Sequence, residues 1–123
     1  APGQVNGNWA VWTSCPDNKS RVARYDIDRS STAYVPNAHG DVDQFGASVT
    51  RSGVVYFGAD RGWCEKVHLM KWDGAISTTV APLPRGSAFQ YSFVADAGRA
   101  RDVYYDQVAC RRDALSDIYR VRD

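Results

Sequence analysis

The 123-residue sequence lacks a long hydrophobic run. A membrane-spanning helix requires roughly 20 consecutive apolar residues, and no stretch of the chain approaches that length. The sequence also lacks an excess of charge of one sign, because 15 lysines and arginines balance 14 aspartates and glutamates without forming blocks. It therefore shows no electrostatic footprint for nucleic acid or an anionic membrane. We expect neither nucleic-acid binding nor membrane insertion.

The signatures of common catalytic and metal sites are missing as well. The sequence contains no nucleophile elbow, phosphate-binding loop, dinucleotide fingerprint or HExxH motif. Its three cysteines and two histidines do not have the CxxC or HxxxH spacings of zinc sites. We therefore predict no catalytic residue, no bound metal and no cofactor.

What the sequence does contain is a pattern that occurs three times. The central copy lies within Ala47–Gly74 and consists of two apolar strands, Val54–Ala59 and Lys66–Trp72, closed by the turn dipeptide Asp73-Gly74. Similar segments precede and follow it, and three markers recur every 44 to 50 residues: Val11, Val55 and Val103; Cys15, Cys64 and Cys110; Asp26, Asp73 and Asp123. A repeat of that length built from short strands is typical of a β-propeller blade.

The repeat predicts an all-β domain at residues 9–123, preceded by a loose leader at residues 1–8. Its units are 9–44, 45–88 and 89–123, about two and a half four-stranded blades. The ten predicted strands are Trp9–Thr13, Ser20–Asp26, Ser31–Val35, Phe45–Thr50, Val54–Ala59, Lys66–Trp72, Ile76–Val80, Phe89–Ala95, Val103–Gln107 and Asp117–Val121.

On this prediction neither terminal unit is a whole blade. The first unit lacks its inner strand and the last lacks its outer strand, so both leave sheet surfaces uncovered. Three arrangements remain open. The chain is a fragment of a longer propeller, a protomer that completes a ring with copies of itself, or a ten-stranded β-sandwich.

The segment Ser48–Phe57, followed by Asp60-Arg61 and by His68–Gly74, resembles the TolB-like propeller repeat. Blades of that repeat consist of a small-residue strand, a Ser-Pro-Asp-Gly turn, an apolar strand ending near Ser-x-Arg-Asp, and an Ile-Tyr-x-Met-x-x-Asp-Gly strand. Asp117–Asp123 matches the last element, and the resemblance covers about two thirds of the chain. It implies a secreted, periplasmic or cell-surface propeller that binds proteins or sugars, or that accompanies an enzyme domain.

Polar and aromatic loop residues are the candidates for ligand binding. In a four-stranded meander, the loops between the second and third strands emerge at the same end as the loops between blades. Trp63 can stack on a sugar or anchor a protein contact, because its flat ring carries a polar tip. The other candidates are His39, Asp41, Asp43, Asp60, Arg61, Arg111 and Arg112.

The three cysteines occupy equivalent places, each shortly after the second strand of its unit. Scarce cysteine, a single methionine and a start at Ala1-Pro2-Gly3 fit an exported chain with one disulfide. Three cysteines permit three single bridges. We predict a disulfide between Cys15 and Cys64, with Cys110 free or paired outside this chain.

Taken together, the sequence predicts a secreted or periplasmic recognition or scaffold module. It binds a protein, a glycan or copies of itself through the loops on one face. The alternatives are a fragment or subunit of a propeller-bearing hydrolase, and a lectin-like carbohydrate-binding module. The lectin alternative predicts aromatics in equivalent loops, yet the counterparts of Trp63 are Ser14 and Ala109.

Overall fold

The computed structural model describes residues 3–16, 18–37, 43–97, 100–111 and 115–123. Within these ranges every regular element is a β-strand, which confirms the all-β class, and there is no helix of the length and apolar character needed to cross a membrane. The strands are β1 (Gln4–Asn6), β2 (Trp9–Ser14), β3 (Arg21–Asp26), β4 (Ser31–Tyr34), β5 (Asp43–Val49), β6 (Val55–Asp60), β7 (Val67–Trp72), β8 (Ser77–Pro82), β9 (Ser87–Ala88), β10 (Ser92–Ala97), β11 (Ala100–Ala109) and β12 (Ser116–Arg122).

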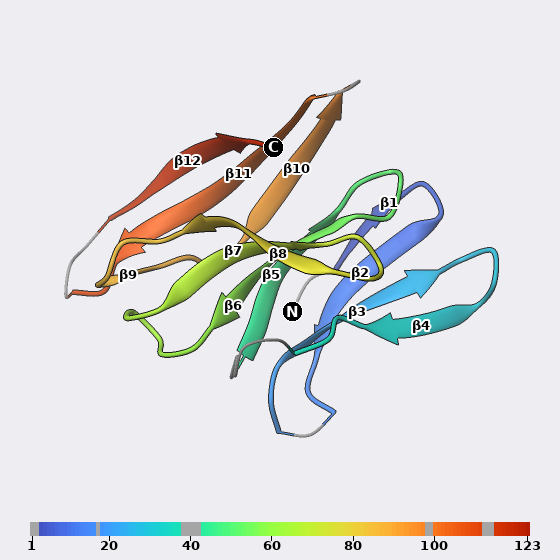
Figure 1. Cartoon of the computed structure of the whole chain (residues 1–123), viewed down its shortest axis with the longest axis horizontal. Helices are drawn as coiled ribbons and strands as arrows, with labels where there is room; N and C mark the ends of the chain where they lie inside the picture. The colour runs from blue at the N-terminus through green and yellow to red at the C-terminus, as the bar shows by residue number, and fades with distance from the viewer. Residues whose placement is uncertain (1–2, 17, 38–42, 98–99, 112–114) are drawn as a thin grey trace.

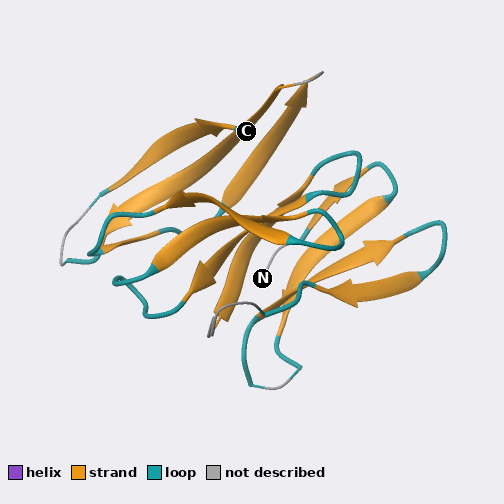
Figure 2. Cartoon of the chain, in the orientation of Figure 1, coloured by secondary structure: helices purple, strands orange, loops and turns teal. Residues whose placement is uncertain are grey.

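These strands form three four-stranded antiparallel sheets in chain order (Figure 1). The first sheet contains β1 to β4 and the middle sheet β5 to β8, each in sequence order. The last sheet has the order β10-β11-β12, and β9 pairs with the end of β11. Figure 2 shows that short loops connect neighbouring strands, as expected for meanders. The alternative of a two-sheet sandwich is therefore wrong.

The first sheet has an inner strand in the segment for which the sequence predicts a loose leader. Gln4–Asn6 pairs with Trp9–Val11 around a tight turn in which Gly7 adopts a φ of 60°. Gly7 and Asn8 are the two turn residues, and glycine suits the first position of such a hairpin loop because it adopts positive φ without strain. The structure thus differs from the prediction at Gln4–Asn6, which form the inner strand that the first unit is predicted to lack.

The second missed strand, β9, lengthens the inner edge of the last sheet. Ser87 and Ala88 pair with Ala109 and Val108, whereas β10 pairs with the preceding part of β11. The inner edge is thus one strand interrupted at residues 89–91. The middle sheet has a related irregularity, since the register between β5 and β6 shifts between Phe45 and Ser48.

The middle sheet is buried on both faces because it packs against both neighbours. Alternate residues of a strand point to opposite faces. Val55, Phe57, Met70 and Trp72 join one apolar cluster with Val11, Val22 and Val35 of the first sheet. Tyr56, Val67 and Leu69 join a second cluster with Ala88, Phe89 and Val103 beside the last sheet. All six residues of β6 are buried, as expected for a strand covered on both sides.

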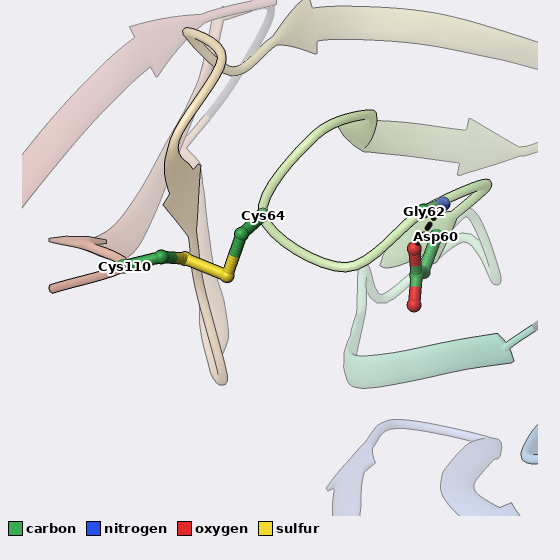
Figure 3. The surroundings of a disulfide bond; sticks show 4 residues. All are labelled: Asp60, Gly62, Cys64 and Cys110. Carbon is green, nitrogen blue, oxygen red and sulfur yellow. Dashed lines mark hydrogen bonds between the residues drawn. A yellow bond between two sulfur atoms is a disulfide. The ribbon is translucent and has the colours of Figure 1, made fainter.

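A disulfide joins the middle and last sheets (Figure 3). Cys64 in the loop after β6 is bonded to Cys110 after β11, and Cys15 is an exposed free thiol. The predicted Cys15–Cys64 bond is therefore wrong. The pairing follows from sheet packing, because main-chain hydrogen bonds from Gly86 N to Cys64 O and from Cys110 N to Gly86 O place the two cysteines on either side of one segment.

Candidate functional site

The inner strands of the three sheets meet around a hollow of about 690 Å³. Polar contacts connect these strands. Gln4 Nε2 of β1 donates to Ser92 O of β10 (3.3 Å), and Ser92 Oγ donates to Gly46 O of β5 (2.5 Å). Ser48 Oγ lies 3.1 Å from Ser92 Oγ. The hollow is therefore built from residues far apart in the sequence.

Gly46 permits the close approach of β5 and the segment before β10. Its φ is 60°, and a Cβ at this position would lie 2.5 Å from Gln90 O. A side chain cannot be accommodated there without moving one of the two main chains. The glycine thus sets the width of the hollow on this side.

Aromatic side chains form one wall of the hollow. Trp63, in the loop between β6 and β7, is 51% exposed and meets Phe45 edge-on with ring centroids 5.5 Å apart. Phe45 in turn contacts Phe89 at 5.2 Å. Gly58 makes room for the Phe45 ring, since any Cβ at Gly58 would overlap it. Two further aromatics, Tyr91 and Phe93, also line the hollow.

Two oriented carboxylates lie in the same lining. Asp43 and Asp60 are directly opposite each other across β5 and β6. Asp43 Oδ1 accepts a hydrogen bond from Ser20 N (2.9 Å), and Asp60 Oδ1 accepts one from Gly62 N (2.6 Å; Figure 3). Asp60 is only 6% exposed. Main-chain donors therefore hold both carboxylates in place before any ligand arrives.

Only part of the predicted binding set gathers here. Trp63, Asp60 and Asp43 line the hollow together. Arg61 and Arg111 are exposed and are not part of the lining. His39, Asp41 and Arg112 lie outside the described residues.

Comparison with models of protein families, with curated proteins and with solved structures finds no match to this chain. The resemblance to the TolB-like repeat therefore stays a prediction from the sequence.

The sequence alone does not predict most of the aromatic wall. Phe45 and Phe89 lie 44 positions apart near the starts of the second and third units, so their repetition was visible. Their place in one wall was not visible, because it depends on how two sheets pack.

Within the described parts of the chain, no three His, Cys, Asp or Glu side chains group closely enough to hold a metal ion. The residues that line the hollow offer stacking and hydrogen bonding.

Proposed function

We propose that this chain is a propeller-type recognition module of an exported protein, and that it binds a glycan in the hollow. The observation that carries the proposal is the half-exposed Trp63 ring in one lining with two oriented carboxylates, Asp43 and Asp60.

The chemistry of the lining suits a sugar ring. A pyranose presents apolar C–H groups on its faces and hydroxyl groups around its rim. An exposed indole offers a flat apolar surface of matching size. Carboxylates and amides such as Gln4 and Gln90 accept and donate hydrogen bonds with hydroxyls, which fixes orientation in an otherwise apolar pocket.

The propeller-type architecture is supported by the arrangement of the sheets. Two four-stranded meanders and the last sheet, a β10-β11-β12 meander extended by β9, follow one another along the chain, and their inner strands β1, β5 and β10 touch through polar contacts. Propeller blades place their inner strands around a central channel in this manner. The Cys64–Cys110 disulfide supports export, because such bonds persist in oxidising compartments.

The hollow is a single site, not one of three equivalent sites. The counterparts of Trp63 in the other units are Ser14 and Ala109, neither of which offers a stacking surface. We therefore expect one glycan per chain, in contrast to lectins that repeat a pocket in every blade.

The test is a glycan array followed by calorimetric titration of the retained glycan. Trp63→Ala should weaken binding by about 30-fold, equivalent to about 2 kcal/mol, because stacking residues at the centre of a site dominate affinity. Ile76→Ala is the matched control: Ile76 is exposed, apolar and outside the hollow, and its loss should leave the dissociation constant unchanged. An array without any retained glycan, or unaltered binding by Trp63→Ala, would contradict the proposal.

The facing carboxylates favour one second candidate, a hydrolase subunit. Most glycosidases act through two carboxyl groups that flank the scissile bond. Here each carboxylate already accepts a main-chain N–H, an arrangement that also serves simply to fix a loop. Reducing-sugar release from the bound glycan, abolished by Asp43→Asn, would favour this candidate over pure recognition.

A further inference from the structure

The charged side chains among the described residues that line the hollow are all acidic. Asp43 and Asp60 belong to the lining, and no described lysine, arginine or histidine does. Across the whole chain 15 lysines and arginines balance 14 aspartates and glutamates, so composition alone does not explain this uniform sign. Asp43 accepts the hydrogen bond from Ser20 N and makes no ion pair with a described residue. Its carboxylate is therefore available to a cationic ligand.

The register of β5 and β6 places the carboxylates beside the aromatic wall. Asp43 pairs with Asp60 across the two strands. Two positions further along β5, Phe45 pairs with Gly58. Because residues two apart point to the same face of a strand, Asp43 and Phe45 project to one side, about 7 Å apart along the strand. Trp63 packs against Phe45, so an acid and an exposed indole border the same part of the hollow.

Trp63 differs from two other tryptophans, because no cation of the described chain lies on its ring. The guanidinium carbon of Arg24 lies 4.4 Å from the ring centroids of both Trp9 and Trp72. Trp63 is 51% exposed, and its aromatic contact among the described residues is with Phe45. An indole face attracts a cation within about 6 Å of its centroid, more strongly than a phenylalanine or tyrosine ring does. The exposed Trp63 ring can therefore receive a cation from a ligand.

A cationic group of a ligand gains from both features of the hollow at once. Asp43 and Asp60 are directly opposite each other, and like charges in this position repel. An ammonium group beside them offsets the repulsion and donates charge-assisted hydrogen bonds, which are about twice as strong as those between neutral groups. A neutral sugar offers only the weaker hydrogen bonds, and an acidic sugar adds a further negative charge.

We propose that the glycan bound in the hollow carries an amino sugar with a free, protonated amino group, held by Asp43 and the Trp63 ring. Asp60 adds its negative charge from a more buried position, at 6% exposure. The hydroxyl groups of the same sugar are matched by the amides of Gln4 and Gln90, which also line the hollow. The amine preference rests on the proposed glycan site and names the class of sugar that the site selects.

The first experiment is a glycan array that carries each amino sugar in a free-amine form and an N-acetylated form, probed with the intact chain. The chain should retain free-amine glycans, such as oligomers of glucosamine, in preference to their N-acetylated counterparts. Calorimetric titration at a pH where the amine is protonated should give a dissociation constant at least about tenfold lower for the free-amine member of such a pair. Added sodium chloride should weaken only the free-amine complex, because salt screens the attraction between opposite charges.

Two aspartate variants locate the site of the amine. Asp43→Asn removes the carboxylate charge but keeps an oxygen for the hydrogen bond from Ser20 N, so the variant should fold. It should weaken binding of the free-amine glycan about tenfold and change binding of the N-acetylated glycan by less than about twofold. Asp28→Asn removes the same charge at an exposed position outside the hollow and should alter neither dissociation constant.

The outcomes separate a failure of the amine preference from a failure of the glycan site. Retention of neutral or acidic glycans without preference for the free amine, or unaltered free-amine binding by Asp43→Asn, would overturn the amine preference and leave the glycan site intact. An array that retains no glycan would contradict the glycan site itself. Tighter binding of Nα-acetyl-lysine methylamide than of the free-amine sugar would assign the cation to a protein side chain and overturn the sugar assignment.

Discussion

Gln44 is a buried polar residue at the junction between the first and middle sheets. Its side chain is fully buried, its Oε1 accepts from Val22 N (2.9 Å), and its Nε2 donates to Val35 O (3.1 Å) and Pro36 O (3.3 Å). These bonds satisfy main-chain groups that pass from one sheet to the next. A residue of similar size without an amide would leave them without partners in a dry environment.

We predict that Gln44→Leu lowers the free energy of unfolding by about 2–4 kcal/mol, because buried donors and acceptors lose their partners. Urea denaturation followed by circular dichroism measures the change. Gln90→Leu is the control, since Gln90 is exposed and its replacement should alter stability by less than about 0.5 kcal/mol. Equal free energies of unfolding for the two variants would show that the hydrogen bonds of Gln44 contribute little to stability.

Tyr56 makes the stability of the fold depend on pH in the alkaline range. It is fully buried, and its hydroxyl donates to Asp123 Oδ2 (2.5 Å). Burial, and next this hydrogen bond, raise the pKa of Tyr56 from 10.0 to about 12. Between these values only the unfolded chain loses the phenolic proton. The contribution of Tyr56 is therefore fully present below pH 10 and is lost as the pH rises to about 12.

We predict that Tyr56→Phe flattens the loss of unfolding free energy over this alkaline range, because the group that titrates differently in the two states is gone. Denaturation curves at a series of pH values measure the slope. Tyr34→Phe, at an exposed position, should keep the wild-type slope. A Tyr56→Phe slope that equals the wild-type slope would refute this origin of the pH dependence.

At the scale of elements, the Cys64–Cys110 disulfide ties the loop after β6 to the end of β11. The two cysteines are 46 positions apart, and closing a loop of that length stabilises a fold by about 4 kcal/mol in the chain-entropy model. The bond also holds the Trp63 loop against the last sheet. It therefore connects the stability of the fold to the shape of the hollow.

We predict that the double variant Cys64→Ser with Cys110→Ser unfolds at a clearly lower temperature, with a loss of about 2–4 kcal/mol, because its unfolded chain is unconstrained. Cys15→Ser is the control: Cys15 is a free, exposed thiol and its replacement should leave the melting temperature unchanged. Thermal melts with and without reductant measure both effects. A reductant-insensitive wild-type melt would contradict the assigned bond.

Elements with strong local signals could be predicted from the sequence, and those defined by distant partners could not. The apolar runs of β6 and β7 and the Asp73-Gly74 turn placed the middle sheet correctly. The two-residue β9 exists only because the ten-residue β11 extends far enough to pair with it. The disulfide was mispredicted because three equivalent loops permit three bridges, and only the packing of the last sheet selects one.

In the candidate site too, residues with a local signal could be predicted from the sequence, and contacts between distant residues could not. Trp63 was recognisable because it lies in a loop between a glycine and a cysteine, where a large aromatic is not needed for a strand core. The sequence predicts Phe45 and Phe89 as the first residues of strands. Their rings meet at 5.2 Å only after two sheets have packed, and sequence periodicity carries no information on that contact.

At the scale of the molecule, the described residues form a series of three sheets whose inner strands converge. The convergence creates the hollow. Because the hollow draws residues from all three sheets, a ligand bound there contacts the ends and the middle of the series at once. We therefore expect ligand binding to rigidify the arrangement of the sheets.

The most direct test of the account is a map of amide chemical-shift changes, measured by NMR when the array-selected glycan is added. We predict that the shifts cluster at Trp63, Phe45 and Ser92 together with Gln4, which belong to three different sheets or their loops. Shifts confined to exposed loops away from the hollow, with Phe45 and Ser92 unaffected, would contradict the claim that the converging inner strands form the binding site.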